Sequence, residues 1–181
     1  MLLQPMVSRL KARRDLPSML DTMVRDVVAL HGAEFGDVQL VGDDGYLWIV
    51  SHSGLTRAFL EAAARLSPDA GTVCARALRE RGTVVVDDVT LDRQFAPFLK
   101  LATGTGFRAV LSSALVSSGG VAVGVVSVHF ANPKVPTGLE LTTLESYCRQ
   151  AADLLVSKET EKGLAAKTPA LSRALLDVAS A

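Results

Sequence analysis

Residues 108–130 contain two apolar, strand-forming runs on either side of a small Ser118-Gly119 turn. Apolar runs that flank small, flexible residues are typical of a β-hairpin, so the stretch predicts two antiparallel strands. Pairing about this turn sets Arg108 opposite His129. Both faces of such a hairpin are too apolar for contact with water, which requires other parts of the chain to cover the sheet on each side.

The two faces of the hairpin can be separated, because successive side chains along a strand point to opposite faces. One face is almost entirely apolar. The other mixes apolar side chains with four polar ones, namely Arg108, Ser112, Ser127 and His129. Polar groups of this kind in an otherwise apolar cavity can orient a small anionic or polar ligand. The alternative for Arg108 and His129 is a position at the end of the sheet, where they reach solvent.

Helical and strand-like periodicities divide the rest of the chain. The patterns predict helices over 16–30, 56–65, 72–81, 94–102 and 139–155, and strands over 38–41, 47–50 and 83–86. The Thr137–Glu140 stretch has the form of a capping box, which is typical of a helix start. This order predicts an α+β fold, an α/β/α sandwich around an antiparallel sheet. We expect the first and last long helices to pack together on one face, and the helix from Thr72 and the segment 87–106 to shelter the other.

Length and composition fit one domain. The chain has 181 residues, of which 49% are hydrophobic and 21% charged. We predict an N-terminal extension over 1–15, the domain over 16–156, and a C-terminal tail or short helix over 157–181, where the apolar stripe of the last helix stops.

The charge balance argues against a nucleic-acid partner. Basic and acidic residues number 19 each, so the protein has no overall field to attract nucleic acid. The one local basic cluster, Arg9, Lys11, Arg13 and Arg14, is interpreted as the solvated face of a helix.

Cysteine content and hydropathy predict a cytoplasmic protein. The two cysteines are too few for a disulfide framework. No apolar run reaches the roughly 18 residues of a membrane helix, and the first ten residues are too polar for a secretory signal. We therefore expect no membrane partner.

Four segments, in this order, resemble the GAF domain family: GTVCARAL at 71–78, VVVDDV with DRQF over 84–95, GFRAVLS at 106–112 and VGVVS at 123–127. With the 139–155 helix, the resemblance covers residues 16–156. Two positions depart from the pattern of many members, which have Pro where Ala114 stands and Gly where Ala75 stands. These departures blur the subfamily assignment without affecting the fold.

The resemblance implies a GAF-like antiparallel sheet of five or six strands, with terminal helices on one face and a helix-loop layer over a ligand pocket on the other. It further implies a non-catalytic small-molecule sensor that acts in signal transduction through a homodimer built on the terminal helices. Family members usually relay their state to an attached output domain, and a separate output protein is a candidate partner here. Family members bind cyclic nucleotides, bilins, haem or small metabolites, and no pattern here selects a cofactor. A covalent bilin is disfavoured, because residues 87–106 contain neither Cys nor His.

Three further residues are candidates for the ligand site. Cys74 lies near a predicted helix start, where the helix dipole can stabilise a thiolate, although a small buried hydrophobe is the simpler interpretation. Phe95 and Phe98 either form a lid over the pocket or pack as ordinary core residues.

Two alternative functions remain open. One is a dimerisation or protein-interaction module whose pocket is filled by its own side chains. The other is free methionine sulfoxide reduction, which some related GAF proteins perform and which needs an attacking and a resolving thiol. Residues 87–106 supply no thiol, and the three histidines lie too far apart along the chain to suggest a metal site. We therefore predict no catalytic and no metal residues.

Overall fold

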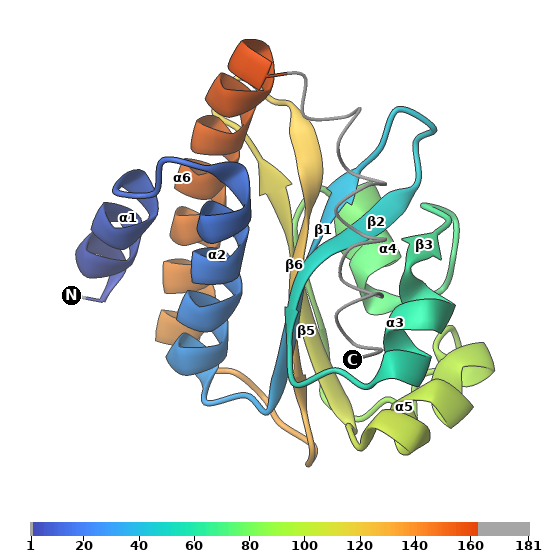
Figure 1. The fold of residues 1–181 in the computed structure, drawn as a ribbon. Coiled ribbons are helices and arrows are strands. Elements are labelled where there is room, and N and C mark those ends of the chain that lie inside the picture. The colour runs from blue at the N-terminus through green and yellow to red at the C-terminus, as the bar shows by residue number, and fades with distance from the viewer. Residues whose placement is uncertain (1, 163–181) are drawn as a thin grey trace.

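The computed structural model of the protein describes residues 2–162, the last four as backbone only. A central antiparallel sheet lies between two helical layers (Figure 1). The strands are β1 (Phe35–Val41), β2 (Leu47–Ser53), β3 (Arg65–Leu66), β4 (Thr83–Val86), β5 (Ala109–Val116) and β6 (Ala122–Phe130). The helices are α1 (Leu3–Lys11), α2 (Leu16–His31), α3 (Arg57–Ala63), α4 (Val73–Glu80), the 3₁₀ turn η1 (Ala96–Phe98), α5 (Leu99–Thr105) and α6 (Gly138–Lys162). The predicted α+β sandwich is confirmed.

The sheet has six strands in the order β3-β2-β1-β6-β5-β4, and its pairs are antiparallel. Its centre joins the N-terminal hairpin to the C-terminal one through β1 and β6. Helices α1, α2 and α6 cover one face, and α3, α4 and α5 lie on the other (Figure 1). Strand β3 was not predicted, because two residues are too few to show a period of two.

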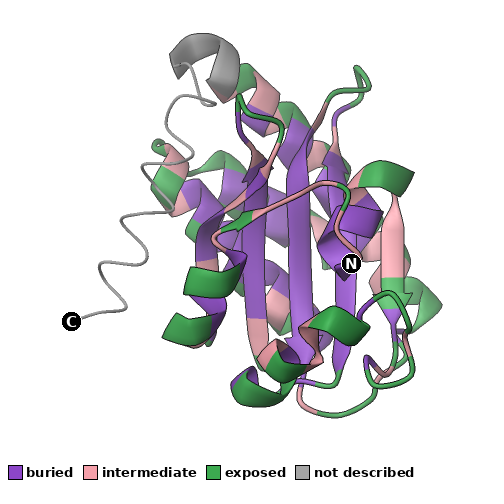
Figure 2. Cartoon of the chain, turned by 90° about the vertical axis from the view of Figure 1, so that its right-hand side faces the viewer, coloured by how far each residue is buried: buried purple, intermediate pink, exposed green. Residues whose placement is uncertain are grey.

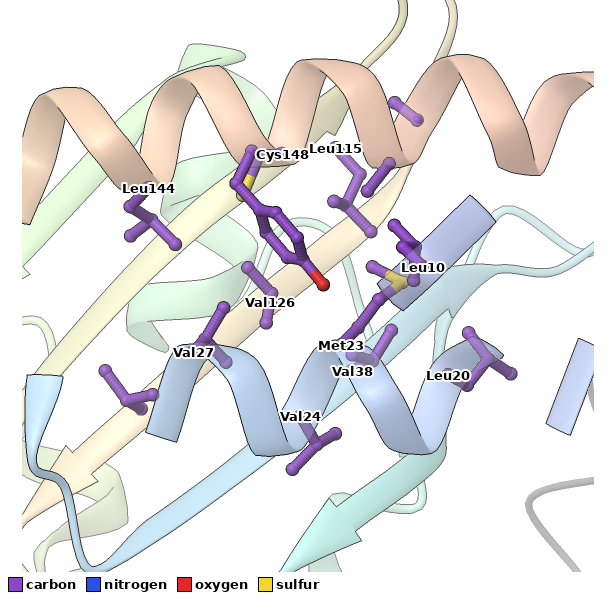
Figure 3. Packing of buried hydrophobic residues seen from close by; sticks show 14 of the residues in the cluster. Leu10, Leu20, Met23, Val24, Val27, Val38, Leu115, Val126, Leu144 and Cys148 are labelled. Carbon is purple, nitrogen blue, oxygen red and sulfur yellow. The ribbon is translucent and has the colours of Figure 1, made fainter. Parts of the chain in front are cut away.

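The larger core fills the space between the sheet and helices α2 and α6 (Figure 3). Met23 and Val27 of α2 and Leu144 and Cys148 of α6 are buried there against the sheet. The fully buried Tyr147 donates a hydrogen bond through its hydroxyl to Asp26 Oδ2 at 3.0 Å. The expected packing of the first and last long helices is thus confirmed.

Helix α1 occupies most of the segment predicted as an extension. Its residues Met6, Val7 and Leu10 are buried, and it packs against α2 and α6. Arg9 of α1 forms an ion pair with Asp26 of α2, with NH2 2.6 Å from Oδ1. The rest of the basic cluster is exposed, as expected for a solvated face.

The long helices begin and end where their capping residues stand. Asp15 accepts a hydrogen bond from the Ser18 amide at the start of α2, and Gly32 ends that helix with a φ of 57°. At the start of α6, Thr137 and Glu140 exchange the two hydrogen bonds of a capping box. Helix α6 continues to Lys162, past the predicted end of the stripe, and residues 163–181 of the predicted tail lie outside the described residues.

The predicted register of the β5–β6 hairpin was wrong by two residues. His129 lies opposite Val110, and Ser127 lies opposite Ser112. The cause is the turn: Ser117 donates its amide hydrogen to the Val121 carbonyl, which closes a longer loop than the two-residue turn assumed, and a bulge follows at the Leu115/Val116 step. Because the shift is even, Ser112, Ser127 and His129 stay on one face.

Gly124 lets the two central strands approach closely, and Gly124→Ala is expected to be strongly destabilising. A Cβ there would lie 2.1 Å from the Gln39 carbonyl oxygen and 3.0 Å from Leu40 Cα, and a backbone neighbour cannot rotate away. We expect a loss of roughly 2 to 4 kcal/mol in the free energy of unfolding, measured in urea. The control Gly119→Ala, where a Cβ meets only the Ser117 hydroxyl at 3.8 Å, is expected to change it by less than about 1 kcal/mol. Equal effects would contradict this explanation.

His31, at the end of α2, makes stability depend on pH. Its buried ring packs against Phe130, and its Nδ1 lies 3.8 Å from Glu140 Oε1. Burial lowers the pKa of His31 from 6.5 to about 4, against the opposing effect of Glu140. The unfolded chain therefore takes up this proton first as the pH falls. The contribution of His31 to stability is complete above pH 6.5 and is lost on the way down to about 4.

His31→Phe is expected to make the free energy of unfolding less dependent on pH in this range, because phenylalanine keeps a buried ring but cannot bind a proton. The wild type should lose up to roughly 3 kcal/mol more than the variant between about pH 7 and about pH 4, as measured by urea unfolding at each pH. Burial also lowers the pKa of His52, so the variant should keep a residual slope of the same sign. Identical slopes in the two proteins would contradict the assignment to His31.

Candidate ligand-binding cavity

A cavity of about 320 Å³ lies between the sheet and the layer formed by α3, α4, η1 and α5. Figure 2 shows the molecule from this side, with buried strands behind helices and loops that are partly exposed. Strands β1, β5 and β6 supply one wall through Asp37, Gln39, Val110, Ser112, Ser127 and His129. The helical layer supplies the opposite wall, which is mostly apolar and aromatic. The volume is at the lower end of the range for pockets that enclose a small molecule.

Six of the seven predicted site residues line this cavity: Cys74, Phe95, Phe98, Ser112, Ser127 and His129. Their role in binding stays a prediction. His129 is only 5% exposed, so the alternative that it reaches solvent at the sheet end is wrong.

Arg108 is the exception, since it lies outside the cavity lining. Its guanidinium, which is about half exposed, forms an ion pair with Asp88. Hydrogen bonds from the Thr90 hydroxyl and from Arg108 hold the pKa of Asp88 below its ordinary value. The prediction that Arg108 faces the ligand therefore lacks support from the structure. Arg108 itself is exposed just before β5, although its neighbours Phe107 and Ala109 are buried.

The sheet wall of the cavity carries polar groups that sequence analysis missed. Asp37 and Gln39 of β1 are 1% and 2% exposed. Asp37 Oδ1 lies 2.8 Å from His129 Nε2, whereas Ser112 and Ser127 share a hydrogen bond of 2.7 Å. Within the described residues, Asp37 Oδ2, Gln39 Oε1 and His129 Nδ1 lack a hydrogen-bond partner. Unpaired polar atoms at this depth are costly, so their accumulation beside one cavity indicates a functional site.

A signal for Asp37 and Gln39 was present in the sequence. They alternate with Val38 and Leu40, which belong to the core on the opposite face of the sheet. Two polar residues two positions apart in a central strand place polar groups on one buried face. The signal was missed because the strand was predicted to begin only at Val38, which left Asp37 outside it and Gln39 as a single polar residue within it.

Aromatic side chains gather at the helical wall. Phe107 lies close to His129, with ring centroids 4.7 Å apart, and makes edge contacts with Phe59 and Phe95 at 6.0 and 6.3 Å. Phe95 and Phe98 are 5.8 Å apart, and Phe95 is 5% exposed. The two predicted lid residues therefore lie together at the cavity, with Phe95 as part of the core.

An ion pair fixes the segment that carries Phe95. Arg76 NH1 of α4 lies 2.9 Å from Asp92 Oδ2, and Asp92 Oδ1 accepts a hydrogen bond from the Phe95 amide at 2.9 Å. Partial burial works in the opposite direction, but the Phe95 amide and Arg76 hold the pKa of Asp92 below its usual value. Gly71 permits the close approach of this segment, since a Cβ there would lie 2.3 Å from the Gln94 carbonyl oxygen. The segment that carries Phe95 is thus attached to α4 through Arg76 and Gly71.

The two cysteines are poor candidates for thiol chemistry. Burial raises the pKa of Cys74 to about 11 and that of Cys148 to about 12. Cys74 packs with Leu47, Ala77 and Val125 on the cavity side, whereas Cys148 belongs to the core under α6, so the sheet separates them. A nucleophile and a resolving thiol within mutual reach are not available in this arrangement.

Residues 2–162 offer neither a metal centre nor a membrane span. Groups of three or more His, Cys, Asp or Glu side chains placed to hold a metal are absent from this part of the chain. Its helices are also too short or too polar to cross a membrane. The fold and the cavity together define an α/β/α domain with a partly open, partly polar pocket beside its sheet.

The family model for the GAF domain matches residues 13–156, so this chain belongs to the GAF domain family. GAF domains typically serve in sensing and signalling. The expected family and fold are both confirmed. The boundaries predicted for the domain and its two flanking segments stay a prediction.

Solved structures agree on the fold. The GAF domain of a phosphoenolpyruvate-protein phosphotransferase from Acinetobacter is 16% identical with a TM-score of 0.73, and the match covers 90% of this chain and 94% of that one. The corresponding domain from Coxiella burnetii is 15% identical with a TM-score of 0.74 and coverages of 90% and 95%. The chromophore-binding domain of a Stigmatella aurantiaca bacteriophytochrome is 17% identical with a TM-score of 0.65 and coverages of 86% and 59%. No curated protein matches the sequence.

Thiol labelling tests the description of the cysteines. Both thiols are buried, so an alkylating reagent at about pH 8 should not label the native protein. Over the same time, the denatured protein should label fully at Cys74 and Cys148. The variant Asp43→Cys, at an exposed turn position, is a positive control that should label in the native state. Rapid native labelling of Cys74 would show that it is accessible and would revive the reductase alternative.

Proposed function

We propose that this GAF domain is a non-catalytic sensor of a small molecule and that its ligand occupies the cavity beside β1, β5 and β6. The observation that carries the proposal is the combination of an open volume of about 320 Å³ with unpaired buried polar atoms on one of its walls. A pocket collapsed on itself would have filled the volume with side chains. A solved structure that shares the fold is the chromophore-binding domain of a bacteriophytochrome, which supports a ligand-binding role for a domain of this fold.

A non-catalytic role agrees with the chemistry of the lining. The buried thiol of Cys74 is held in its protonated form at neutral pH, and Ser112 and Ser127 hydrogen-bond to each other. A nucleophilic serine instead needs a base within reach of its hydroxyl. These residues therefore suit recognition better than reaction.

The sheet offers a route from the ligand to the helices on its other face. Gln39 lines the cavity, whereas its neighbours Val38 and Leu40 pack in the core with α2 and α6. A ligand that favours one position of β1 therefore favours one packing of these helices. Such coupling requires a ligand that binds the two arrangements with different affinity.

In this proposal the domain acts in the cytoplasm as a homodimer, and its output lies on a separate protein. Helices α2 and α6 are the proposed site of dimer contact, because they pack directly on the sheet face opposite the cavity. Native mass spectrometry of the purified protein should show a dimer, and any bound ligand should appear as mass beyond that of the two subunits. A monomer at micromolar concentration would contradict the homodimer.

Closing the mouth of the cavity tests the ligand site. Ala62 is exposed on α3 and lines the cavity, so Ala62→Trp should block entry without disturbing the core. A ligand found by native mass spectrometry, or by a thermal shift in a metabolite screen, should lose at least about tenfold in affinity in this variant. Glu61→Trp adds the same side chain one position away, outside the cavity lining, and should leave binding unchanged. Equal binding by the two variants, or a protein that binds none of the metabolites, would favour the ligand-free interaction module.

A further inference from the structure

We infer that the cavity is built for an organic cation, a ligand that carries an amine or amidine group on an apolar, ring-sized body. The inference rests on the proposed function, since it specifies the ligand of the same cavity. Its basis is a buried carboxylate with one unpaired oxygen, placed opposite a wall of aromatic rings.

Asp37 provides the negative charge. Its side chain lines the cavity and is 1% exposed, and its Oδ1 is occupied by His129 Nε2 at 2.8 Å. Oδ2 has no partner among the described residues. A buried carboxylate oxygen without a donor is unfavourable, and a ligand N–H that reaches it would remove that cost through a charge-assisted hydrogen bond.

Gln39 adds a second acceptor on the same strand. It lies two residues from Asp37, so the two side chains share the cavity face of β1, and its Oε1 is also unpaired among the described residues. Two neighbouring acceptors match a ligand group that has more than one N–H, as primary ammonium and amidinium groups do. A ligand carboxylate or phosphate would instead place like charge beside Asp37.

The cationic groups near the site are poorly placed to bind an anion. Arg108, which the sequence had suggested for this task, pairs with Asp88 outside the cavity, and Arg76 pairs with Asp92. Lys100 lines the cavity but is exposed on α5, where water screens its charge. Arg76 is buried and its Nε and Nη2 are unpaired among the described residues, but it lies outside the cavity lining. An anion in the cavity would therefore lie beside the carboxylate of Asp37, whose partner there is His129.

The aromatic wall suits the remainder of such a ligand. Phe59, Phe95, Phe98 and Phe107 line the cavity, and their rings lie at edge or tilted angles to one another. The face of an aromatic ring attracts a cation, and the rings also pack against an apolar body. Carboxylate and aromatic groups thus favour the same class of ligand from opposite walls.

Three ring compounds that differ only in their polar group test the inference. Benzylamine, benzyl alcohol and benzoate are titrated into the wild-type protein, and the signals of cavity residues are followed by NMR. Benzylamine should bind at least about tenfold more tightly than benzyl alcohol, because only the amine gains a charge-assisted hydrogen bond, and benzoate should bind most weakly. This comparison needs no variant and therefore does not depend on whether a substituted protein folds.

The substitution Asp37→Asn assigns the preference to the carboxylate. It should lower the affinity for benzylamine to about that for benzyl alcohol and leave the affinity for the alcohol within about twofold. Asp43→Asn makes the same change at an exposed position and should have no effect. Circular dichroism confirms that each variant is folded before it is titrated.

The possible failures are distinguishable. Equal binding of amine and alcohol, or tighter binding of benzoate, would overturn the cation inference while showing that the cavity admits ligands. Binding of none of the three would also overturn it, and the sensor proposal would then be decided by the Ala62→Trp comparison alone. An amine preference that survives in Asp37→Asn would show that another group is responsible.

Discussion

The pairing of β1 with β6 is the contact on which both halves of the protein depend. It joins two hairpins that are far apart in the sequence, and Gly124 opposite Leu40 makes it close enough to complete the sheet. The same two strands present Val38 and Val126 to the helical core and Asp37 and His129 to the cavity. Because successive side chains of β1 point to opposite faces, its apolar residues pack in the core and its polar residues line the cavity.

The polar wall of the cavity has an energetic cost that this core must offset. Burying Asp37, Gln39 and His129 with one atom of each unpaired reduces the stability of the empty domain. The large apolar core between the sheet and the terminal helices supplies stability elsewhere, with further support from Tyr147 and Arg9, which both bind Asp26. Unpaired polar atoms at one site, offset by a well-packed core elsewhere, are typical of a domain whose native state binds a ligand.

The sequence predicted regular elements well because their causes are local. Apolar spacing identified α2 and α6, and the Thr137–Glu140 capping box identified where α6 begins. The packing of α1 on the domain was not predicted, because its buried side chains Met6, Val7 and Leu10 form too short a stripe to indicate a partner. Sequence patterns say more about local elements than about which elements, distant in sequence, pack together.

The site was predicted in part, for the same reason. Ser112, Ser127 and His129 follow from alternation within one hairpin, and they stayed on the cavity face even though the register moved by two. Arg108 lies outside the cavity lining, since alternation does not show where the strand ends. The neighbour of His129 is Asp37, 92 positions away in sequence, and only the order of strands in the sheet brings them together.

Helix α1 limits how two copies of the domain can meet. It lies over α2 and α6, the helices that the proposed homodimer would use, and the side chains beneath it are already buried (Figure 1). A second copy therefore has to approach along the part of these helices that α1 leaves uncovered, or pair through α1 itself. In the proposed homodimer, α1 would therefore restrict how the two copies pair, although it contributes no residue to the cavity lining.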